Sequence, residues 1–136
     1  MLVVEGTSQN DSIEIETRER GSDDVLDLYF NGVRTETFAM PTSRIVVYGQ
    51  AGNDEIRVDD DVELDTWMFG GFGNDTLIGG SGNSILVGGA GDDLLRGRSG
   101  EDILIGGRDR DLLFGGDDDN IQIGRASCRE RVCSTV

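Results

Sequence analysis

Aspartate recurs at a fixed spacing in the second half of the chain, a few residues after a glycine pair. Asp75, Asp93, Asp102 and Asp111 each occupy the sixth place of a nine-residue block. Carboxylates and backbone carbonyls are hard oxygen ligands of the kind that Ca²⁺ prefers. Carboxylates repeated at this spacing therefore indicate a row of cation sites rather than one catalytic centre.

The blocks run without insertion from residue 70 to residue 123. They read GGFGNDTLI, GGSGNSILV, GGAGDDLLR, GRSGEDILI, GGRDRDLLF and GGDDDNIQI, and a looser copy, GQAGNDEIR, occupies residues 49–57. Glycines at positions 1, 2 and 4 allow positive φ and close backbone approach, so positions 1–6 can form a tight turn. Positions 7–9 are mostly apolar or β-branched and favour one very short strand. A period of this kind is typical of a solenoid.

Side chains alternate along a strand, so position 8 points to one face and positions 7 and 9 to the other. Position 8 predicts a core column made of Leu77, Leu86, Leu95, Leu104 and Leu113, preceded by Ile56 and Met68. We expect two blocks to complete one coil, and successive coils to stack at about 4.7–4.9 Å. Alternate blocks then lie above one another.

Sorting alternate blocks by edge separates two columns of position-6 residues. One edge carries Asp54, Asp75, Asp93 and Asp111, and the other carries Ser84, Asp102 and Asn120. Two carboxylates flank every interval of the first column but only one flanks each interval of the second. We therefore predict calcium along the first edge, with Asp93 serving two neighbouring ions, and weak or empty sites along the second.

The blocks resemble the RTX (repeats-in-toxin, haemolysin-type) calcium-binding nonapeptide, G-G-x-G-x-D-x-U-x, where U is a large apolar residue. The resemblance covers residues 70–123 well and residues 49–57 acceptably. It implies an all-β fold, a right-handed parallel β-roll (β-solenoid), with several Ca²⁺ ions at the turns. It also implies export through a type I channel and folding only outside the cell, hence an extracellular or cell-surface location.

The residues that we expect to contribute to the metal sites are turn aspartates and glycines of these blocks. They are Asp54, Gly70, Gly71, Gly73, Asp75, Gly88, Gly89, Gly91, Asp93, Asp102, Gly106, Gly107, Asp109 and Asp111. We predict no catalytic residue and no organic cofactor.

The first third of the chain is strand-rich and partly repeats the second. The segment Leu2-Val3-Val4-Glu5-Gly6 matches Ile45-Val46-Val47-Tyr48-Gly49 at an offset of 43 residues, and each is followed by Asn-Asp-x-Ile. Between them, Asn31-Gly32 is flanked by two apolar runs, which is a strong hairpin pattern. We interpret residues 1–48 as a strand-rich N-terminal extension with a degenerate repeat turn, leading into a β-roll at residues 49–123.

Residues 124–136 break every rule of the repeats and contain both cysteines, Cys128 and Cys133. The ten residues IGRASCRERV can be encoded by a string that resembles a common short-read sequencing adapter. We therefore expect residues 124–136 to be a non-native tail. The alternative is a short basic natural tail.

Composition excludes several classes of function. The net charge of −15 disfavours nucleic acid and anionic membranes as partners. The chain has neither histidine nor lysine, which rules out Ser-His-Asp, Cys-His, H-E-x-x-H and Walker A chemistry. No stretch approaches the roughly 18 apolar residues of a membrane span, and the N-terminus lacks the pattern of a cleaved signal peptide. We predict a protein that is not an enzyme.

Two further expectations concern the context of the chain. One face of the roll carries an aliphatic stripe made of Ile85, Val87, Ile103, Ile105, Ile121 and Ile123, which we expect to contact a protein partner or a second copy. The alternative is that strand propensity alone selects these residues. The chain is expected to be part of a secreted or cell-surface bacterial protein. The alternative is a non-catalytic C-terminal secretion and folding module of a protease, lipase or haemolysin.

Overall fold

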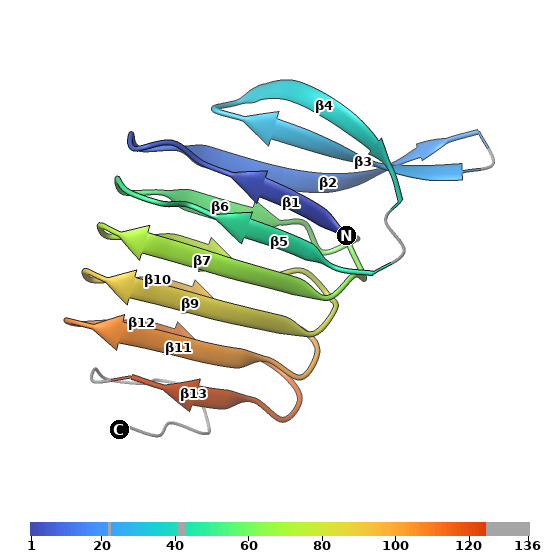
Figure 1. Cartoon of the computed structure of the whole chain (residues 1–136). Coiled ribbons are helices and arrows are strands. Elements are labelled where there is room, and N and C mark those ends of the chain that lie inside the picture. Colours follow the sequence, from blue (N-terminus) through green and yellow to red (C-terminus); the bar gives the residue numbers. More distant parts are fainter. Residues whose placement is uncertain (22, 41–42, 125–136) are drawn as a thin grey trace.

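The computed structural model describes residues 1–21, 23–40 and 43–124, and within these residues all regular structure is β-strand. The strands form two sheets that face each other across an apolar core and are joined by short turns at two edges (Figure 1). The chain is therefore a β-solenoid, as the repeats predicted. Apart from Gly124, the tail predicted to be non-native lies outside the described residues.

Sheet A contains six parallel strands in sequence order. They are β1 (Leu2–Glu5), β5 (Ile45–Tyr48), β7 (Thr66–Phe72), β9 (Ser84–Ala90), β11 (Ile103–Arg108) and β13 (Ile121–Ile123). Sheet B is ordered β12 (Leu112–Phe114), β10 (Leu94–Arg96), β8 (Thr76–Ile78), β6 (Glu55–Val58), β2 (Ser12–Arg20), β3 (Asp23–Phe30) and β4 (Val33–Ala39).

The registers of the strands reproduce the two periods of the sequence. In the repeats, Leu95 pairs with Leu77 and with Leu113, each 18 residues away, so two nonapeptides complete one coil. At the other end Leu2 pairs with Ile45, at the offset of 43 residues. β1 and the first half of β2 thus form a coil of the same roll, and the intervening residues loop out as a hairpin.

The core is built from position 8 of the repeats, because that side chain points between the sheets. The predicted column is buried throughout, with relative exposures of 0–1% for Ile56, Met68, Leu77, Leu86, Leu95, Leu104 and Leu113. Each coil adds one leucine-sized side chain from each sheet, so the apolar contact is continuous along the roll.

The hairpin of β3 and β4 extends sheet B beyond β2. Asn31 and Gly32 form its turn with φ of 52° and 80°, as the Asn-Gly pair predicted. Leu26 and Leu28 of β3 join the same buried cluster as the repeat leucines. The hairpin therefore packs on the N-terminal end of the roll and supplies core that the first coil lacks.

Candidate metal site

The first edge of the roll consists of the turns that lead from sheet A to sheet B, at residues 49–54, 70–75, 88–93 and 106–111. Each turn ends in an aspartate that is nearly inaccessible to solvent. Relative exposures are 2% for Asp54, 1% for Asp75, 3% for Asp93 and 1% for Asp111. Ionised carboxylates are rarely buried unless they are paired or bound to a cation.

One oxygen of each of these carboxylates holds neighbouring coils together. Oδ1 of Asp75 accepts a hydrogen bond of 2.8 Å from the backbone N–H of Asp54, and Oδ1 of Asp93 accepts one of 2.8 Å from Asp75. Oδ1 of Asp111 accepts the next from the backbone N–H of Asp93, at 2.9 Å. The aspartates thus form a ladder along the first edge, in the order that the spacing predicted.

The other oxygen has no such bond. Oδ2 of Asp54, Asp75, Asp93 and Asp111 is buried without a hydrogen-bond partner among the residues that the structure describes. Burial raises the pKa of Asp75 to about 6 and the pKa of Asp93 to about 7. Such an oxygen needs either a proton or a cation when the surrounding solution is neutral.

Backbone carbonyl oxygens lie beside these carboxylates because position 1 is glycine. A Cβ added to Gly70 would lie 2.5 Å from Oδ2 of Asp75 and 2.7 Å from the carbonyl oxygen of Gly88. Any side chain at position 1 would therefore fill the space that the two oxygens border. Carboxylate and carbonyl oxygens facing one small space are a donor set that fits Ca²⁺.

Positive φ is confined to the middle of the turn. Gly71 and Gly73, at positions 2 and 4, have φ of 98° and 112°, whereas Gly70 at position 1 does not adopt the left-handed region. The sequence predicted positive φ or close approach for all three glycines. All three positions of this turn have a close approach, and positive φ is added at positions 2 and 4. In the second-edge turn at residues 79–84, Gly80 and Gly82 occupy the same positions without positive φ.

No group of three or more acidic, histidine or cysteine side chains converges within the described ranges. The ions of a calcium column would therefore depend on one or two carboxylates and on the carbonyls of the turns. This donor set matches the nine-residue period, which supplies one aspartate and several glycine carbonyls per turn.

Comparison with known proteins identifies this period. The RTX calcium-binding nonapeptide repeat model matches residues 69–104 and 96–124, with 4 copies of the repeat. Residues 69–124 belong to the RTX calcium-binding repeat family. Neither the curated proteins nor the solved structures contain a match to the chain.

The second edge of the RTX roll carries the turns at residues 79–84, 97–102 and 115–120. Here too the side chains form a ladder, because Asp102 Oδ1 accepts from the N–H of Ser84 at 2.8 Å and Asn120 Oδ1 accepts from Asp102 at 2.9 Å. Asp102 Oδ2 is buried without a partner among the described residues, and burial raises the pKa of Asp102 to about 7. Asp102 therefore has the environment of a first-edge aspartate but no carboxylate directly above or below it.

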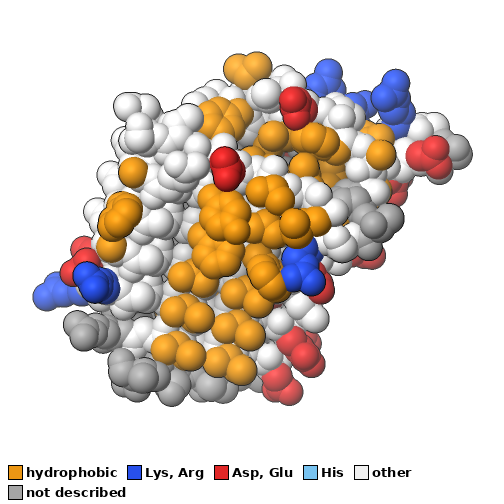
Figure 2. Space-filling view, viewed as in Figure 1, with side chains coloured by type: hydrophobic (Ala, Val, Ile, Leu, Met, Phe, Trp, Pro, Cys, Tyr) orange, Lys and Arg blue, Asp and Glu red, His pale blue; other side chains and the backbone are white. Residues whose placement is uncertain are grey.

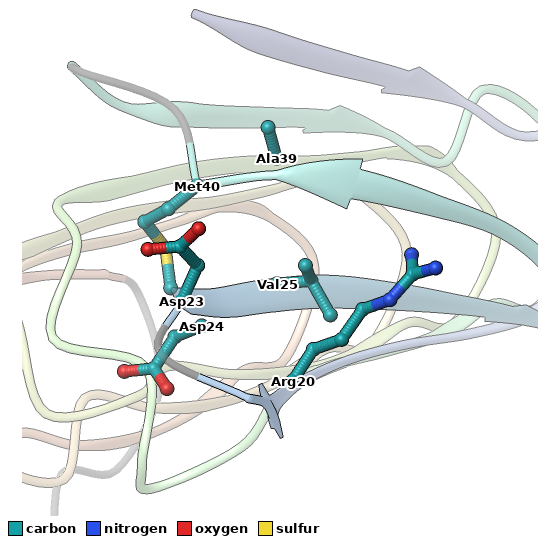
Figure 3. Close-up of a pocket in the computed structure, with 6 residues that line it drawn as sticks. All are labelled: Arg20, Asp23, Asp24, Val25, Ala39 and Met40. Atoms are coloured by element: carbon teal, nitrogen blue, oxygen red, sulfur yellow. The ribbon is translucent and has the colours of Figure 1, made fainter.

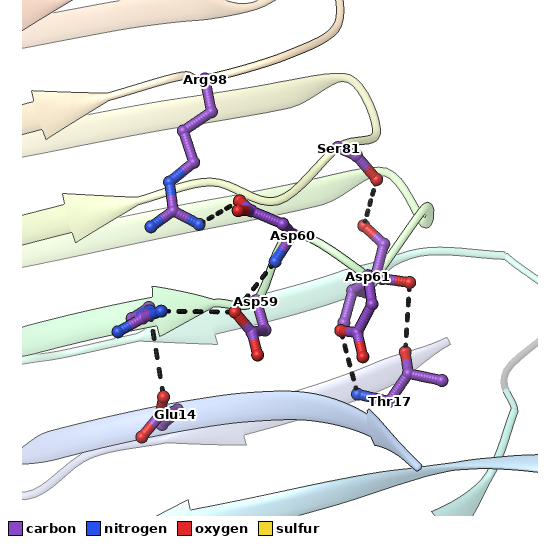
Figure 4. Close-up of polar contacts among 9 residues, drawn as sticks. Glu14, Thr17, Asp59, Asp60, Asp61, Ser81 and Arg98 are labelled. Atoms are coloured by element: carbon purple, nitrogen blue, oxygen red, sulfur yellow. Dashed lines mark hydrogen bonds and ion pairs between the residues drawn. The ribbon is translucent and has the colours of Figure 1, made fainter. Parts of the chain in front are cut away.

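An ion pair spans the second edge where the loop after β6 disturbs the stacking. Arg98, at position 2 with φ of 73°, contacts Asp60 of that loop (Figure 4). Asp59 pairs with Arg57 at 3.3 Å, and the backbone N–H of Thr17 donates to Asp61 at 3.4 Å. Two of the three loop carboxylates thus have a cationic partner from the chain itself.

The remaining predicted residues are found in the turns of the first edge. The glycines at positions 1, 2 and 4 are Gly70, Gly71, Gly73, Gly88, Gly89, Gly91, Gly106 and Gly107, and their backbones stack between coils. Asp109 replaces the position-4 glycine and is exposed. Its Oδ2 accepts from the N–H of Gly91 at 3.1 Å. Burial, with the nearby charges of Asp92 and Asp109, raises the pKa of Asp111.

The ladder has one further member, Asp11, which was not among the predicted ligands. Its backbone N–H donates to Asp54 Oδ1 at 2.8 Å, so the first edge begins one coil before Asp54. Asp11 Oδ2, however, accepts from the N–H of Thr7 at 2.6 Å and from its Oγ1 at 2.9 Å. Asp11 is thus satisfied by its own turn. The Asn-Asp-x-Ile motif at an offset of 43 residues is the pattern that could have identified it.

Several hollows lined by described residues lie beside the hairpin or at the second edge. One is lined by Arg20, Asp23, Asp24, Val25, Ala39 and Met40 at the outer end of the hairpin (Figure 3). These side chains do not include a nucleophile paired with a base. Among the described residues there is also no helix that is long and apolar enough to cross a membrane.

Proposed function

We propose that Ca²⁺ binds along the first edge of the roll, between Asp54, Asp75, Asp93 and Asp111, and that this binding drives the roll to fold. The proposal rests on a difference between the two oxygens of each carboxylate, and this difference repeats along the edge. Oδ1 is hydrogen-bonded to the neighbouring coil, while Oδ2 is buried and unpartnered within the described chain. A divalent cation beside Oδ2 supplies the missing partner.

Without a cation, this edge opposes folding. Four carboxylates are brought into one column and removed from water, in a chain whose net charge is −15. Burial of each charge is unfavourable, and charges in one column repel each other. Ions that bind the folded roll and not the unfolded chain shift the equilibrium toward folding.

The residues that would hold the ions are the buried carboxylates of the turns and the backbone carbonyls beside them. The carboxylates are Asp54, Asp75, Asp93 and Asp111, with Asp102 as an isolated candidate on the second edge. The position-1 glycines bring carbonyl oxygens beside them, as at Gly88. The glycines at positions 2 and 4 and Asp109 shape the turns that bring these oxygens together.

We also propose that the chain is a non-catalytic part of a secreted or cell-surface bacterial protein. Repeats of this family are typical of secreted bacterial proteins. Extracellular calcium modules bind with Kd on the order of 10⁻⁴–10⁻³ M. An affinity in that range would leave the chain metal-free and unfolded before export and loaded outside. Attachment to a secreted enzyme or toxin as its folding module is compatible with the same mechanism.

A calcium titration of the wild type and of matched variants tests the proposal. Circular dichroism would follow folding, and isothermal titration calorimetry would give the number of ions. Asp93→Asn should weaken calcium-driven folding about tenfold or more, because the amide replaces a charged ligand and Asp93 borders two intervals. Asp24→Asn, at a surface position of the hairpin, is the control and should titrate like the wild type.

The second edge provides the sharper comparison. Asp102→Asn removes an equally buried carboxylate, but the neighbours of Asp102 in its column, Ser84 and Asn120, are not carboxylates. Asp102→Asn should therefore weaken calcium-driven folding much less than Asp93→Asn. Equal midpoints for wild type and Asp93→Asn would contradict the column assignment. A roll that stays folded in excess chelator at neutral pH would contradict calcium-driven folding.

A further inference from the structure

The outer face of sheet A carries two uninterrupted columns of side chains that point away from the core. The registers align Val3, Val46, Trp67, Ile85, Ile103 and Ile121 in the first column, and Glu5, Tyr48, Phe69, Val87, Ile105 and Ile123 in the second. We call these twelve residues the outer apolar face. It includes the six aliphatic residues identified from the sequence and adds an aromatic half.

This face is hydrophobic, and its side chains are partly or fully exposed except for Val46, which is 5% exposed (Figure 2). Ile121 is 54% exposed, Val3 46% and Tyr48 39%. Tyr48 stacks on Phe69 with ring centroids 5.1 Å apart, and Arg44 lies 4.2 Å above the ring of Trp67. Contiguous apolar surface of this kind is uncommon on monomeric soluble proteins and marks interaction sites.

The opposite face of the roll differs in composition. The outward columns of its repeat strands mix charged and apolar side chains, with Glu55, Thr76, Leu94 and Leu112 in one and Arg57, Ile78, Arg96 and Phe114 in the other. Arg57 lies 3.9 Å from Glu14, and Arg96 lies above the ring of Phe114. The outer apolar face contains a single charged residue, Glu5, in a chain in which 29% of residues are charged. Strand propensity acts on both faces alike, so it does not account for this asymmetry.

We propose that the outer apolar face is a dimer interface, on which a second copy of this chain docks sheet against sheet. The face is flat and regular because its side chains repeat at strand spacing, and it spans about 24 Å across six strands. A second copy presents the same spacing, so rows of side chains can interdigitate as they do between the sheets of a sandwich. Two such faces together bury on the order of 1,000 Å², the size at which specific interfaces begin.

Charge favours an antiparallel arrangement of the two sheets. Arg44 lies just before β5, beside the Trp67 ring, whereas Glu5 ends β1, the strand that pairs with β5. When the strands of the second copy run in the opposite direction, each Arg44 lies at the end of the partner's strands, where Glu5 is located. The cation and the anion of this surface then meet across the interface, which is isologous.

Sedimentation equilibrium of the full chain in saturating calcium tests the proposal. The wild type should dimerise, and higher salt should tighten the dimer because two acidic chains repel each other less. Val87→Asp should weaken the dimer about tenfold or more, since it places a charge at the centre of the contact. The control is Ile78→Asp, which changes position 9 of the preceding repeat on the opposite face and should leave the dimer unchanged.

Two further variants keep the test decisive. Val87→Thr preserves the shape and strand propensity of the side chain, so it should fold like the wild type yet weaken the dimer. Glu5→Arg should also weaken it, and adding Arg44→Glu should recover affinity relative to Glu5→Arg alone. A monomeric wild type, or equal losses for Val87→Asp and Ile78→Asp, would overturn the dimer. A double variant no tighter than Glu5→Arg would overturn the antiparallel arrangement.

The dimer and the calcium column are separable in this experiment. Val87→Asp should still bind calcium with wild-type affinity, because Val87 lies on the outer face rather than in a turn. A wild-type chain that binds calcium but stays monomeric would refute the dimer alone. A chain that dimerises without binding calcium would refute the calcium column alone.

Discussion

The backbone N–H of Asp75 donates a hydrogen bond of 2.8 Å to Oδ1 of Asp93, one coil further along the roll. The same carboxylate keeps Oδ2 buried without a partner among the described residues. One side chain therefore fixes the stacking of two coils and keeps a second oxygen for the cation that we propose. If that proposal holds, position 6 specifies both the fold and its dependence on metal.

The raised pKa values predict how the metal-free chain responds to pH. Burial raises the pKa of Asp75 to about 6 and of Asp93 and Asp102 to about 7, above the ordinary aspartate value near 4. A raised folded-state pKa contributes stability that is present below the ordinary value and lost as pH rises through the folded-state pKa. In chelator, the roll should therefore be more stable at pH 4.5 than at pH 7.5.

Urea denaturation at the two pH values, with chelator and with calcium, measures this effect. Calcium should restore stability at pH 7.5 and have little effect at pH 4.5, where protons occupy the carboxylates. A metal-free chain that is more stable at pH 7.5 than at pH 4.5 would contradict the assignment of the buried oxygens.

Glycine at position 4 should be required both for its positive φ and for the close approach of the neighbouring coil. Two variants separate these effects. Gly91 has φ of 118°, and a Cβ there would collide with the carbonyl oxygen of Gly73. Gly21 has φ of 68° but open space around it. Gly21→Ala should cost about 1 kcal/mol from backbone strain alone. Gly91→Ala should lower the free energy of unfolding several times more, as measured by denaturation in calcium. Equal losses for the two variants would show that the coils do not stack tightly at position 4.

The hairpin should lose stability in acid, which is opposite to the expected effect at the first edge. Asp27 is 1% exposed and its pKa is well below the ordinary value because of hydrogen bonds from Arg18 and Thr37. A lowered folded-state pKa gives stability that is present above the ordinary value near 4 and is lost as pH falls below it. Asp27→Asn should cost about 1–3 kcal/mol at pH 7 and flatten the stability profile below pH 4. An unchanged profile would mean that other carboxylates dominate acid unfolding.

Thr7 should stabilise Asp11, the first aspartate of the ladder, through hydrogen bonds rather than through a metal ion. Its hydroxyl donates to Asp11 and accepts from the N–H of Gln9 at 3.0 Å. Thr7→Val keeps the shape of the side chain but removes both bonds, and should cost about 1–2 kcal/mol. Thr35→Val, on the exposed strand β4, is the control and should be nearly neutral. Similar losses in the free energy of unfolding for both variants would show that Thr7 does not stabilise the start of the ladder.

The repeats made most of the roll predictable. A nine-residue period with an apolar residue at position 8 dictates both the core column and the 18-residue register, and the structure has both. The sorting of Asp54, Asp75, Asp93 and Asp111 onto one edge followed from the same period. These features depend on local turn chemistry and alternation, which sequence records directly.

Features that depend on contacts between distant, non-repeated segments were not predictable. Asp27 is an aspartate within a strand, and its ion pairs come from Arg18 on the neighbouring strand and from Arg34 beyond a register shift. The position of Trp67 in the outer apolar face is evident only from the structure, which places β5 and β7 in register with the repeats. The residues around 58–60 interrupt the period there, so no pattern connected the aromatic half to the aliphatic one.

The most direct test of calcium binding along the first edge is diffraction from calcium-loaded crystals at a long wavelength, where calcium scatters anomalously. We expect anomalous peaks in the intervals between Asp54, Asp75, Asp93 and Asp111, each within about 2.3–2.6 Å of a carboxylate oxygen. Crystals grown in millimolar calcium with no peak beside any of these four aspartates would contradict it.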